Sequence, residues 1–413
     1  MSRMLPAIGV VSLLLVAPPL ARADVVQEWN AIMLQNNSSL NAFLQVRLAA
    51  ITHVAVFEAV NAITGQYEPY LGTITAPGGA SPEAAAATAA HDVLVYYLSA
   101  PDTVLALDAA LKASLAAIPD GQSKTDGVAV GQAAAQAMIG LRIGDGSEPP
   151  LFFFPTSSNP GEWQLTQSCT AGVFFHWQDV KPFAILSSGQ FRSDPPPALT
   201  SKKYTEDYNE VKALGAVDST LRPPDRTDVA RFYARALALN VWDRVAQQLG
   251  AESGSSLSEN ARAFALINMA LLDAGISVME TKYFYRFWRP ETAIHAGDTD
   301  GNPDTTGDSN FAPLIFTPCF PSYGSAHASA SYAARRVAEE IWGAGRHSIE
   351  LTVPSLDLTF HYTTLREITD DIDDARVYGG IHFRFDQQAG ARQGWRVGGY
   401  VYDTRLRPLQ LQY

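Results

Sequence analysis

The sequence predicts an all-α protein made of packed helical bundles, interrupted by one long loop segment that is rich in proline and aromatic residues. Three observations support this fold class. Apolar side chains recur at helical spacing along residues 47–61. Alanine-rich blocks follow helix-start signals such as Ser81, Pro82 and Glu83. Signals for β-strands are sparse, and a hydrophobic content of 47% against a charged content of 17% indicates a large buried interior.

The same signals place the elements in order along the chain. Before the loop segment, they predict helices at residues 25–63, 82–98, 102–117 and 125–143. Residues 144–200 hold several prolines with many aromatic residues between them, which indicates an ordered, packed loop and not a free linker. Beyond it, helices are expected at residues 204–214, 227–249, 258–285 or beyond, 325–343, 363–375 and 385–402, with a short strand or loop at 353–359.

The first 23 residues are typical of a secretory signal peptide. Arg3 provides a weak positive start, residues 8–16 form an apolar core, and Ala21 and Ala23 satisfy the small-residue cleavage rule. The alternative is a buried first helix. We expect export to the periplasm or the extracellular space after cleavage near Ala23. The mature chain is expected to combine an N-terminal helical region with its loop, 24–200, and a C-terminal helical catalytic region, 201–413, in one compact unit.

Charge and cysteine content limit the partners of the protein. A formal net charge of −12 argues against non-specific binding to nucleic acid. No segment after the signal peptide approaches the roughly 18 uninterrupted apolar residues of a membrane span. The two cysteines, Cys169 and Cys319, could form a disulfide or stay as two buried thiols. The oligomeric state is left open.

Three separated fragments in the last third of this acidic chain carry basic and imidazole groups. On a continuous helix, Lys282, Arg286 and Arg289 would share roughly one face, set among aromatic residues. Ser325 and His327 lie at a predicted helix start, where free N–H groups and the helix dipole favour anions. The third fragment contains Arg376 and His382, between which Gly379 and Gly380 can break a helix so that both side chains point at one place.

Each fragment alone has an ordinary structural alternative. The basic residues could form a solvated or salt-bridged face, and His327 could be a capping or core residue. Arg376 could pair with the acidic run at residues 370–374. Taken together, the fragments contain the groups needed to neutralise a tetrahedral oxyanion, with one imidazole to bond its centre and another to move protons.

The three fragments resemble the signature of the vanadium-dependent haloperoxidases and the related type 2 phosphatidic-acid phosphatases. That signature is Lys, six residues and Arg-Pro, then Pro-Ser-Gly-His, then Ser-Arg, five residues and His. The first fragment matches it fully through Pro290. The second has Gly324 for Pro and Ala326 for Gly, and the third has Ala375 for Ser. The flanking residues look like the soluble bacterial-type haloperoxidase branch, and the resemblance covers roughly residues 200 to 405.

The resemblance implies a role for each matching residue. His382 would bond vanadate or attack a phosphoryl group, and His327 would be the acid–base group. Phe320 would help to form a halide pocket. The groups that would hold the oxyanion are Lys282, Arg289, Arg376, the Ser325 hydroxyl and the Ala326 N–H. The sequence departs from the expected pattern in two places. Met279 stands where a Trp is expected, and the segment Ala234, Arg235 and Ala236 stands where an acidic residue is expected shortly after residues 230–233.

The implied activity is that of a vanadate-dependent haloperoxidase, which oxidises halide with hydrogen peroxide to hypohalous acid and can pass the halogen to an organic acceptor. One alternative is an acid phosphatase that cleaves a phosphoester through a phosphohistidine at His382. The other is a non-catalytic oxyanion-binding protein. A separate acidic stretch, residues 298–304, alternates oxygen ligands as calcium loops do, but Pro303 stands where such a loop needs glycine, which favours an acidic surface turn.

Overall fold

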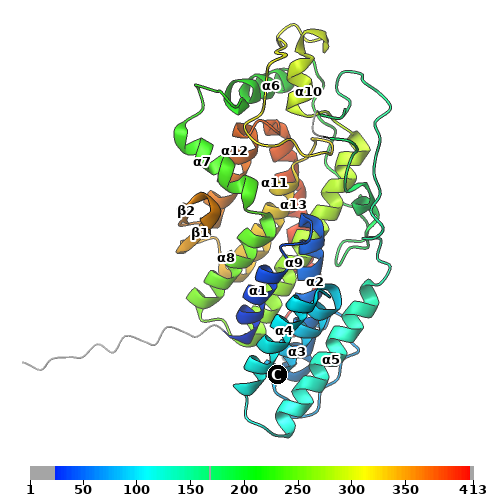
Figure 1. Ribbon diagram of the computed structural model, residues 1–413, viewed down its shortest axis with the longest axis vertical. Coiled ribbons are helices and arrows are strands. Elements are labelled where there is room, and N and C mark those ends of the chain that lie inside the picture. Colours follow the sequence, from blue (N-terminus) through cyan, green and yellow to red (C-terminus); the bar gives the residue numbers. More distant parts are fainter. Residues whose placement is uncertain (1–23, 167–168, 410–413) are drawn as a thin grey trace, which may run out of the picture.

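The computed structural model describes residues 24–409 apart from 167 and 168. In this part of the chain α-helices dominate, and the one sheet is a two-stranded hairpin, so the predicted all-α class is confirmed. The predicted signal peptide lies outside the described residues and stays a prediction. The helices α3, α4 and α5 lie at one end of the long axis, and α6 and α10 lie at the other (Figure 1).

The N-terminal helices form a bundle that precedes the long loop. Residues 25–63 are helical as predicted, but in two helices, because Asn41 caps a new helix by accepting hydrogen bonds from Phe43 N and Leu44 N. Ser81 caps the next helix as predicted. Helices α3 and α5 approach closely, since a Cβ at Gly131 would lie 2.5 Å from Ala85 O. The five helices are α1 Val25–Asn36, α2 Ala42–Thr64, α3 Pro82–Tyr97, α4 Pro101–Ala116 and α5 Gln122–Arg142.

The long loop packs onto the helices, as its aromatic content predicted. Asp273 in α9 accepts hydrogen bonds from three consecutive loop amides, at residues 183, 184 and 185, over 2.7–2.9 Å. Cys169 and Cys319 form a disulfide with a Cα–Cα distance of 5.5 Å, and Val173 N donates to Cys319 O. The loop is therefore fixed to the central helix and to the segment that precedes α11.

The C-terminal half contains the remaining helices and the hairpin. The helix predicted at residues 227–249 is wrong as a single element, because the chain breaks at Ala236 and Leu237. The predicted strand or loop at 353–359 covers the hairpin turn. The helices are α6 Lys202–Gly215, α7 Pro224–Arg235, α8 Ala238–Ser253, α9 Leu257–Tyr285, α10 Pro290–His295, α11 Ala326–Trp342, α12 Leu365–Tyr378 and α13 Arg384–Thr404. Short 3₁₀ turns cover Phe175–Asp179, Gly297–Thr299 and Pro354–Leu356.

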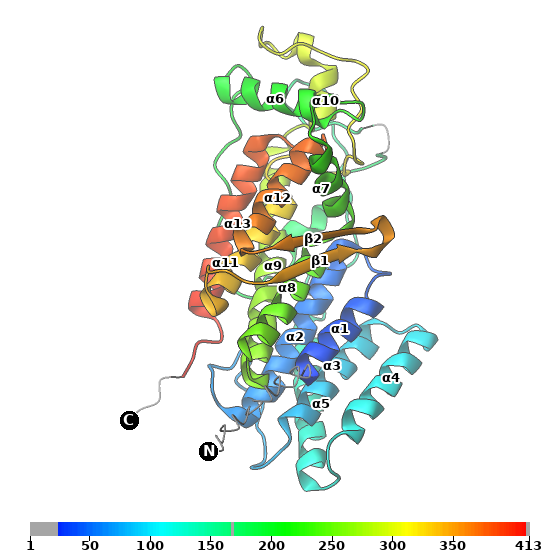
Figure 2. The ribbon, with the colours of Figure 1, turned by 90° about the vertical axis from the view of Figure 1, so that its left-hand side faces the viewer.

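The strands β1 Ile349–Val353 and β2 Leu358–Tyr362 pair antiparallel, with Ile349 opposite Tyr362. The hairpin lies across α8, which it contacts through β1 (Figure 2). Arg244 and Gln248 of α8 hydrogen-bond to the backbone of β1, so its outer edge is covered.

Helix α9 is the centre of the molecule. It packs against α2 of the N-terminal bundle and against α11 and α13 of the C-terminal half. Both α2 and α9 are long and apolar enough to cross a membrane, but they are buried in the fold, as core helices of this length are. The C-terminal end of α9 carries Lys282 into the region where the other sequence fragments meet.

Candidate functional site

Lys282 and Arg289 lie in one site, but not on one continuous helix as predicted. Helix α9 ends at Tyr285, and Arg286 has a left-handed conformation with φ 48°. A segment of the long loop causes this break, because Trp163 N donates to Arg286 O and Trp288 N donates to Gly161 O. The predicted continuous helix face is therefore wrong. Arg286 is exposed and its guanidinium lies 4.9 Å from the centre of the Phe153 ring, outside the site.

The two remaining cations of this fragment are buried and held by main-chain carbonyls. Lys282 Nζ donates to Pro321 O at 2.9 Å and to Ser322 O at 2.8 Å. Arg289 precedes α10 and donates through Nε to Phe320 O at 2.8 Å and through Nη1 to Ile381 O at 2.9 Å. Both side chains have 0% exposure. The fragment around residues 320–322 thus joins the two cations to the second motif.

Arg376 and His382 converge because α12 ends between them, as predicted. Gly380 has φ 78°, and a Cβ there would lie 2.4 Å from Gly215 O. This close approach requires glycine and turns the chain back toward the bundle. Arg376 is buried in the last turn of α12 and donates from Nη1 to Tyr233 O at 3.1 Å.

The alternative in which Arg376 pairs with the acidic run is not observed. Asp371 and Asp374 instead contact Arg226, with N–O distances of 2.7 and 3.4 Å. Asp373 accepts a hydrogen bond from the Tyr332 hydroxyl. Arg376 therefore faces the site without a carboxylate partner among the described residues.

His382 is oriented by Asp386, a residue that the sequence reasoning missed. The Nδ1 atom of His382 lies 2.8 Å from Asp386 Oδ2, and its Nε2 atom lies 3.0 Å from Arg289 Nη1. Because Arg289 can only donate, Nε2 carries the lone pair and Nδ1 carries the proton. Ser322 also donates to Asp386 Oδ2, at 2.5 Å. The spacing of four residues between His382 and Asp386, at a helix start, was the available signal in the sequence.

The second motif lies at the start of α11. Ser325 is the N-cap, its Oγ accepts from Ala328 N, and its own N–H donates to Asp386 O at 2.9 Å. The Ser325 hydroxyl donates to no acceptor among the described residues, so its proton is available to a ligand. Ala326 is the first residue of the helix. His327 is half-buried and has no hydrogen-bond partner in the described part of the chain.

The ring of Phe320 lies close to both buried cations of the first fragment, Lys282 and Arg289. The centre of its ring is 5.1 Å from Lys282 Nζ and 4.9 Å from Arg289 Cζ. Phe320 and His327 also line a pocket of about 140 Å³, whose other walls are apolar and include Phe43 and Phe174. Small solutes would therefore approach His327 through an apolar space.

Burial and mutual repulsion of the cations dominate the electrostatics of the site. Burial, and then the charge of Arg289, lower the pKa of Lys282 well below its ordinary value. Burial lowers the pKa of Arg289 to about 9 and that of Arg376 to about 10. The carboxyl group of Asp386 has its pKa raised by burial to about 6, against the effects of Ser322 and the cations.

Both histidines are neutral for the same reasons. Burial and the charges of Arg376 and Lys282 lower the pKa of His327 well below its ordinary value. Burial, Arg289 and the other cations do the same for His382, and His327 itself adds to the effect. The two imidazoles therefore lie within electrostatic reach of each other.

The donor set fits an oxyanion. Among the described residues, three buried cations lie near the buried carboxylate of Asp386, and the charge of Glu291 also acts on Arg289, so positive charge remains in excess. Burying uncompensated charge is unfavourable. Arg289 Nη2 and Arg376 Nε are buried and make no hydrogen bond in the described part of the chain. A multiply charged oxyanion such as vanadate or phosphate would satisfy these donors and offset the excess positive charge.

The acidic stretch at residues 298–304 has its oxygens engaged by its own loop. Asp300 accepts from Asn302 N and from the Thr305 hydroxyl, and Asp298 accepts from Gly307 N. Among the described residues, no group of three His, Cys, Asp or Glu side chains is arranged to hold a metal ion. The favoured interpretation as an acidic turn agrees with these contacts.

Comparison with known proteins relates this chain to one group. Residues 262–410 match the family model described as the VCPO second helical-bundle domain. The vanadium chloroperoxidase of Curvularia inaequalis is 25% identical over 283 residues, which cover 52% of this chain and 46% of that protein. The matched segment thus spans less than half the length of that curated relative.

Two solved structures share the fold over nearly the whole chain. A bacterial vanadium-dependent iodoperoxidase, described as the first of its kind, superposes with a TM-score of 0.78 at 23% identity, covering 94% of this chain and 97% of the other. A holo-type bacterial vanadium-dependent chloroperoxidase gives a TM-score of 0.70 at 15% identity, with coverage of 94% and 93%.

Proposed function

We propose that this chain, which belongs to the vanadium-dependent haloperoxidase superfamily, is a vanadate-dependent peroxidase. It would oxidise halide with hydrogen peroxide to hypohalous acid. One observation carries the proposal. Three buried cations act on His382, whose Nε2 lone pair is directed at Arg289 Nη1, and Asp386 is the buried carboxylate that contacts the imidazole. Such a preorganised cationic cavity stabilises a compact oxyanion without the reorganisation that water would need.

The residues divide into those that hold the oxyanion and those that act beside it. His382 Nε2 would bond vanadium, because Asp386 fixes the proton on the opposite ring nitrogen. Bound vanadate would supply a Lewis-acidic centre that activates hydrogen peroxide toward halide. The groups that would neutralise or hydrogen-bond its oxygens are Lys282, Arg289, Arg376, the Ser325 hydroxyl and the Ala326 N–H.

His327 would handle protons at the mouth of the site. Its low pKa leaves the imidazole neutral at neutral pH, so it can accept a proton from an entering peroxide. Phe320 covers the two cations on the pocket side and would form part of the halide position. The apolar walls around His327 would also admit an organic acceptor.

An acid phosphatase is the second candidate, because the geometry of His382 suits it as well. The same Nε2 lone pair that would bond vanadium could attack a phosphoryl group. Charge spread over the oxygens of a phosphoryl-transfer transition state requires the same three cations. His327 would then protonate the leaving oxygen.

Parallel assays of the purified protein, with and without vanadate, distinguish these activities. The proposal expects halogenation of a dye only when vanadate, hydrogen peroxide and halide are all present. Phosphoester hydrolysis that vanadate inhibits would support the phosphatase instead. Neither activity, with vanadate still raising the melting temperature, would indicate an oxyanion-binding protein.

A pair of histidine variants tests the site itself. His382→Ala should abolish either activity, because it removes the atom that bonds the oxyanion. His295→Ala is the control, since His295 hydrogen-bonds to Phe311 O outside the site and should leave the rate unchanged. An unaffected rate in His382→Ala would end the assignment.

A further inference from the structure

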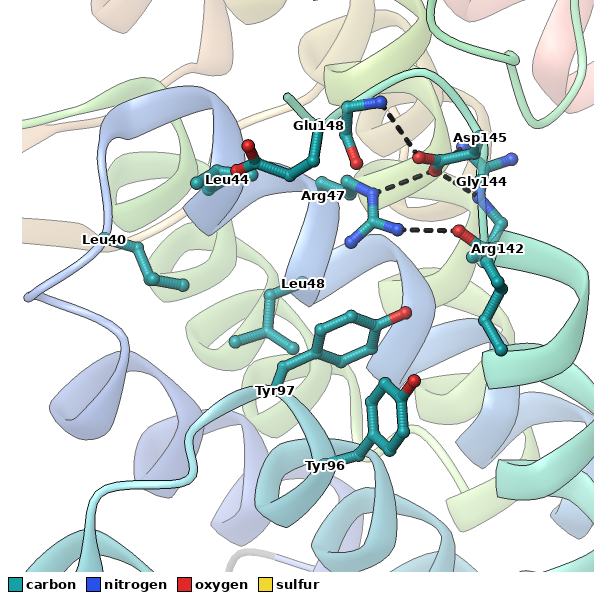
Figure 3. Close-up of a pocket in the computed structure, with 12 residues that line it drawn as sticks. Leu40, Leu44, Arg47, Leu48, Tyr96, Tyr97, Arg142, Gly144, Asp145 and Glu148 are labelled. Carbon is teal, nitrogen blue, oxygen red and sulfur yellow. Dashed lines mark hydrogen bonds and ion pairs between the residues drawn. The ribbon is translucent and has the colours of Figure 1, made fainter. Parts of the chain in front are cut away.

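A second pocket, of about 380 Å³, lies in the N-terminal bundle. It is bordered by the first turns of α2, the end of α3 and the turn that follows α5 (Figure 3). Its α2 residues are Leu44, Arg47 and Leu48, whereas Phe43 and Val46 of the same helix line the pocket beside His327. The two pockets therefore share a helix but no residue.

A buried charge cluster forms the polar side of this pocket. Arg47 Nε donates to Asp145 Oδ2 at 2.8 Å, and Arg142 contacts the same oxygen with Nη2 at 2.8 Å and Nε at 3.0 Å. Arg47 is 7% exposed and Arg142 is 1% exposed. Two guanidinium groups thus share the carboxylate of Asp145, and the buried carboxylate of Asp273 also lies within electrostatic range of Arg142.

Both carboxylate oxygens of Asp145 already accept hydrogen bonds within this part of the fold. Burial raises the pKa of its carboxyl group, but hydrogen bonds from Arg47 and Ser147 and the charges of both arginines outweigh that effect and lower it overall. Arg142 is occupied as well, because it also donates to Lys181 O and Pro182 O. Each nitrogen of the Arg142 guanidinium thus has an acceptor, and Arg47 is the arginine of this cluster that is left to meet a ligand.

The Arg47 guanidinium has one nitrogen left for a ligand. Its Nη2 donates to Arg142 O at 2.9 Å, whereas Nη1 contacts no carboxylate or carbonyl of the described residues. In Figure 3 one terminal nitrogen of Arg47 carries no dashed line. The Tyr97 ring lies 5.1 Å from Arg47 Cζ and its hydroxyl also hydrogen-bonds to Arg47, while Tyr96 lines the pocket beside it.

The other walls of the pocket are apolar and favour a ligand that has an apolar part. Leu40, Leu44 and Leu48 border the space opposite the tyrosines (Figure 3). A bare inorganic anion would leave this surface in contact with water, whereas a ligand with an apolar body would cover it. Glu148, the one unpaired acid of the lining, is exposed at the rim, where solvent screens it.

We propose that this pocket binds a small organic monocarboxylate with an apolar body, its carboxylate on Arg47 and its body against the three leucines. A carboxylate accepts charge-assisted hydrogen bonds from guanidinium, which are stronger than hydrogen bonds between neutral groups. The binding is independent of the oxyanion site and of its proposed chemistry.

Titration calorimetry with benzoate, and with uncharged benzamide as its isostere, tests this proposal on the full-length protein. Benzoate should bind at one site and benzamide should bind about tenfold more weakly or not at all. Arg47→Met should weaken benzoate about ten- to a hundredfold, because it removes a charge-assisted hydrogen bond. Leu44→Trp keeps every charge, fills the pocket and should weaken benzoate by a similar factor.

Two controls locate the ligand. Arg231→Met removes an exposed guanidinium elsewhere and should leave the affinity unchanged. Benzoate should also bind His382→Ala as it binds the parent protein. The proposal is overturned if benzoate does not bind, if benzamide binds equally well, if vanadate displaces benzoate, or if Leu44→Trp binds with unchanged affinity. Should Arg47→Met fail to fold, as judged by its melting curve, Leu44→Trp decides the question alone.

Discussion

Replacing Asp386 with asparagine should weaken the binding of vanadate while leaving the fold intact. Asp386 Oδ2 accepts three hydrogen bonds, from Ser322 Oγ at 2.5 Å, His382 Nδ1 at 2.8 Å and Phe383 N at 3.1 Å. An asparagine oxygen can accept the same three bonds. It lacks the negative charge, however, so the imidazole becomes a poorer electron donor at Nε2 and the three cations lose their only buried counterion.

The size of the effect follows from these contacts. Loss of an outer partner of a metal-ligating histidine typically lowers affinity or activity about 10- to 100-fold, which corresponds to about 1.4–2.7 kcal/mol. Asp386→Ala is less informative, because it leaves three buried donors without an acceptor at about 1–3 kcal/mol each. We therefore expect Asp386→Ala to unfold at clearly lower denaturant concentration and Asp386→Asn to change mainly the vanadate affinity.

Calorimetric titration of vanadate into both forms measures this difference, and the halogenation rate at saturating vanadate gives a second readout. Asp207→Asn is the control, because the Asp207 carboxylate also accepts a backbone N–H at the start of α13, from Phe385 at 2.7 Å, without touching the imidazole. The reasoning is refuted if Asp386→Asn binds vanadate as tightly as the parent protein, or if Asp207→Asn weakens it equally.

Three further changes have defined outcomes. Burial raises the pKa of Asp243 to about 8, so the folded state keeps a proton that the unfolded chain releases. The contribution of Asp243 to stability should therefore fall as pH rises from about 4 to about 8, and Asp243→Asn should remove that contribution from the difference between the two melting-temperature profiles. Asp273→Ala should lower the free energy of unfolding in urea by about 3 kcal/mol or more, because three buried loop amides lose their acceptor; a loss below about 1 kcal/mol would contradict this. Replacing Cys169 and Cys319 with serine should lower the free energy of unfolding by about 2–5 kcal/mol, and reductant should then have no further effect on melting.

The sequence allowed the convergence of its three basic fragments to be predicted, because their residue types and spacing matched a known signature. Lys282, Arg289, Arg376 and His382 do contact or influence one another in the structure, and the break before His382 was expected from its two glycines. Asp386 was missed because an acidic residue four positions after a histidine is common on helices. That spacing indicates an orienting carboxylate only once the histidine is known to be buried in a site.

Two helix boundaries could not be predicted from the residues next to them. Pro290 discourages a helix that continues past it, but nothing in the sequence places the end of α9 as early as Tyr285. The end is imposed by pairing with a loop that is more than 100 residues away in sequence. Likewise, the break before α8 has neither glycine, proline nor a capping side chain; Leu237 is its N-cap and makes no side-chain hydrogen bond. Such breaks arise from tertiary contacts, which override local propensity.

The carbonyl oxygens that hold Lys282 and Arg289 belong to the peptide chain, so no substitution can delete them or exchange them for carboxylates. Substitutions in the apolar entrance can therefore change which solutes enter while the main-chain bonds that orient Lys282 and Arg289 persist. Under the proposed function, selectivity for the entering solute and affinity for the oxyanion would then be free to change separately.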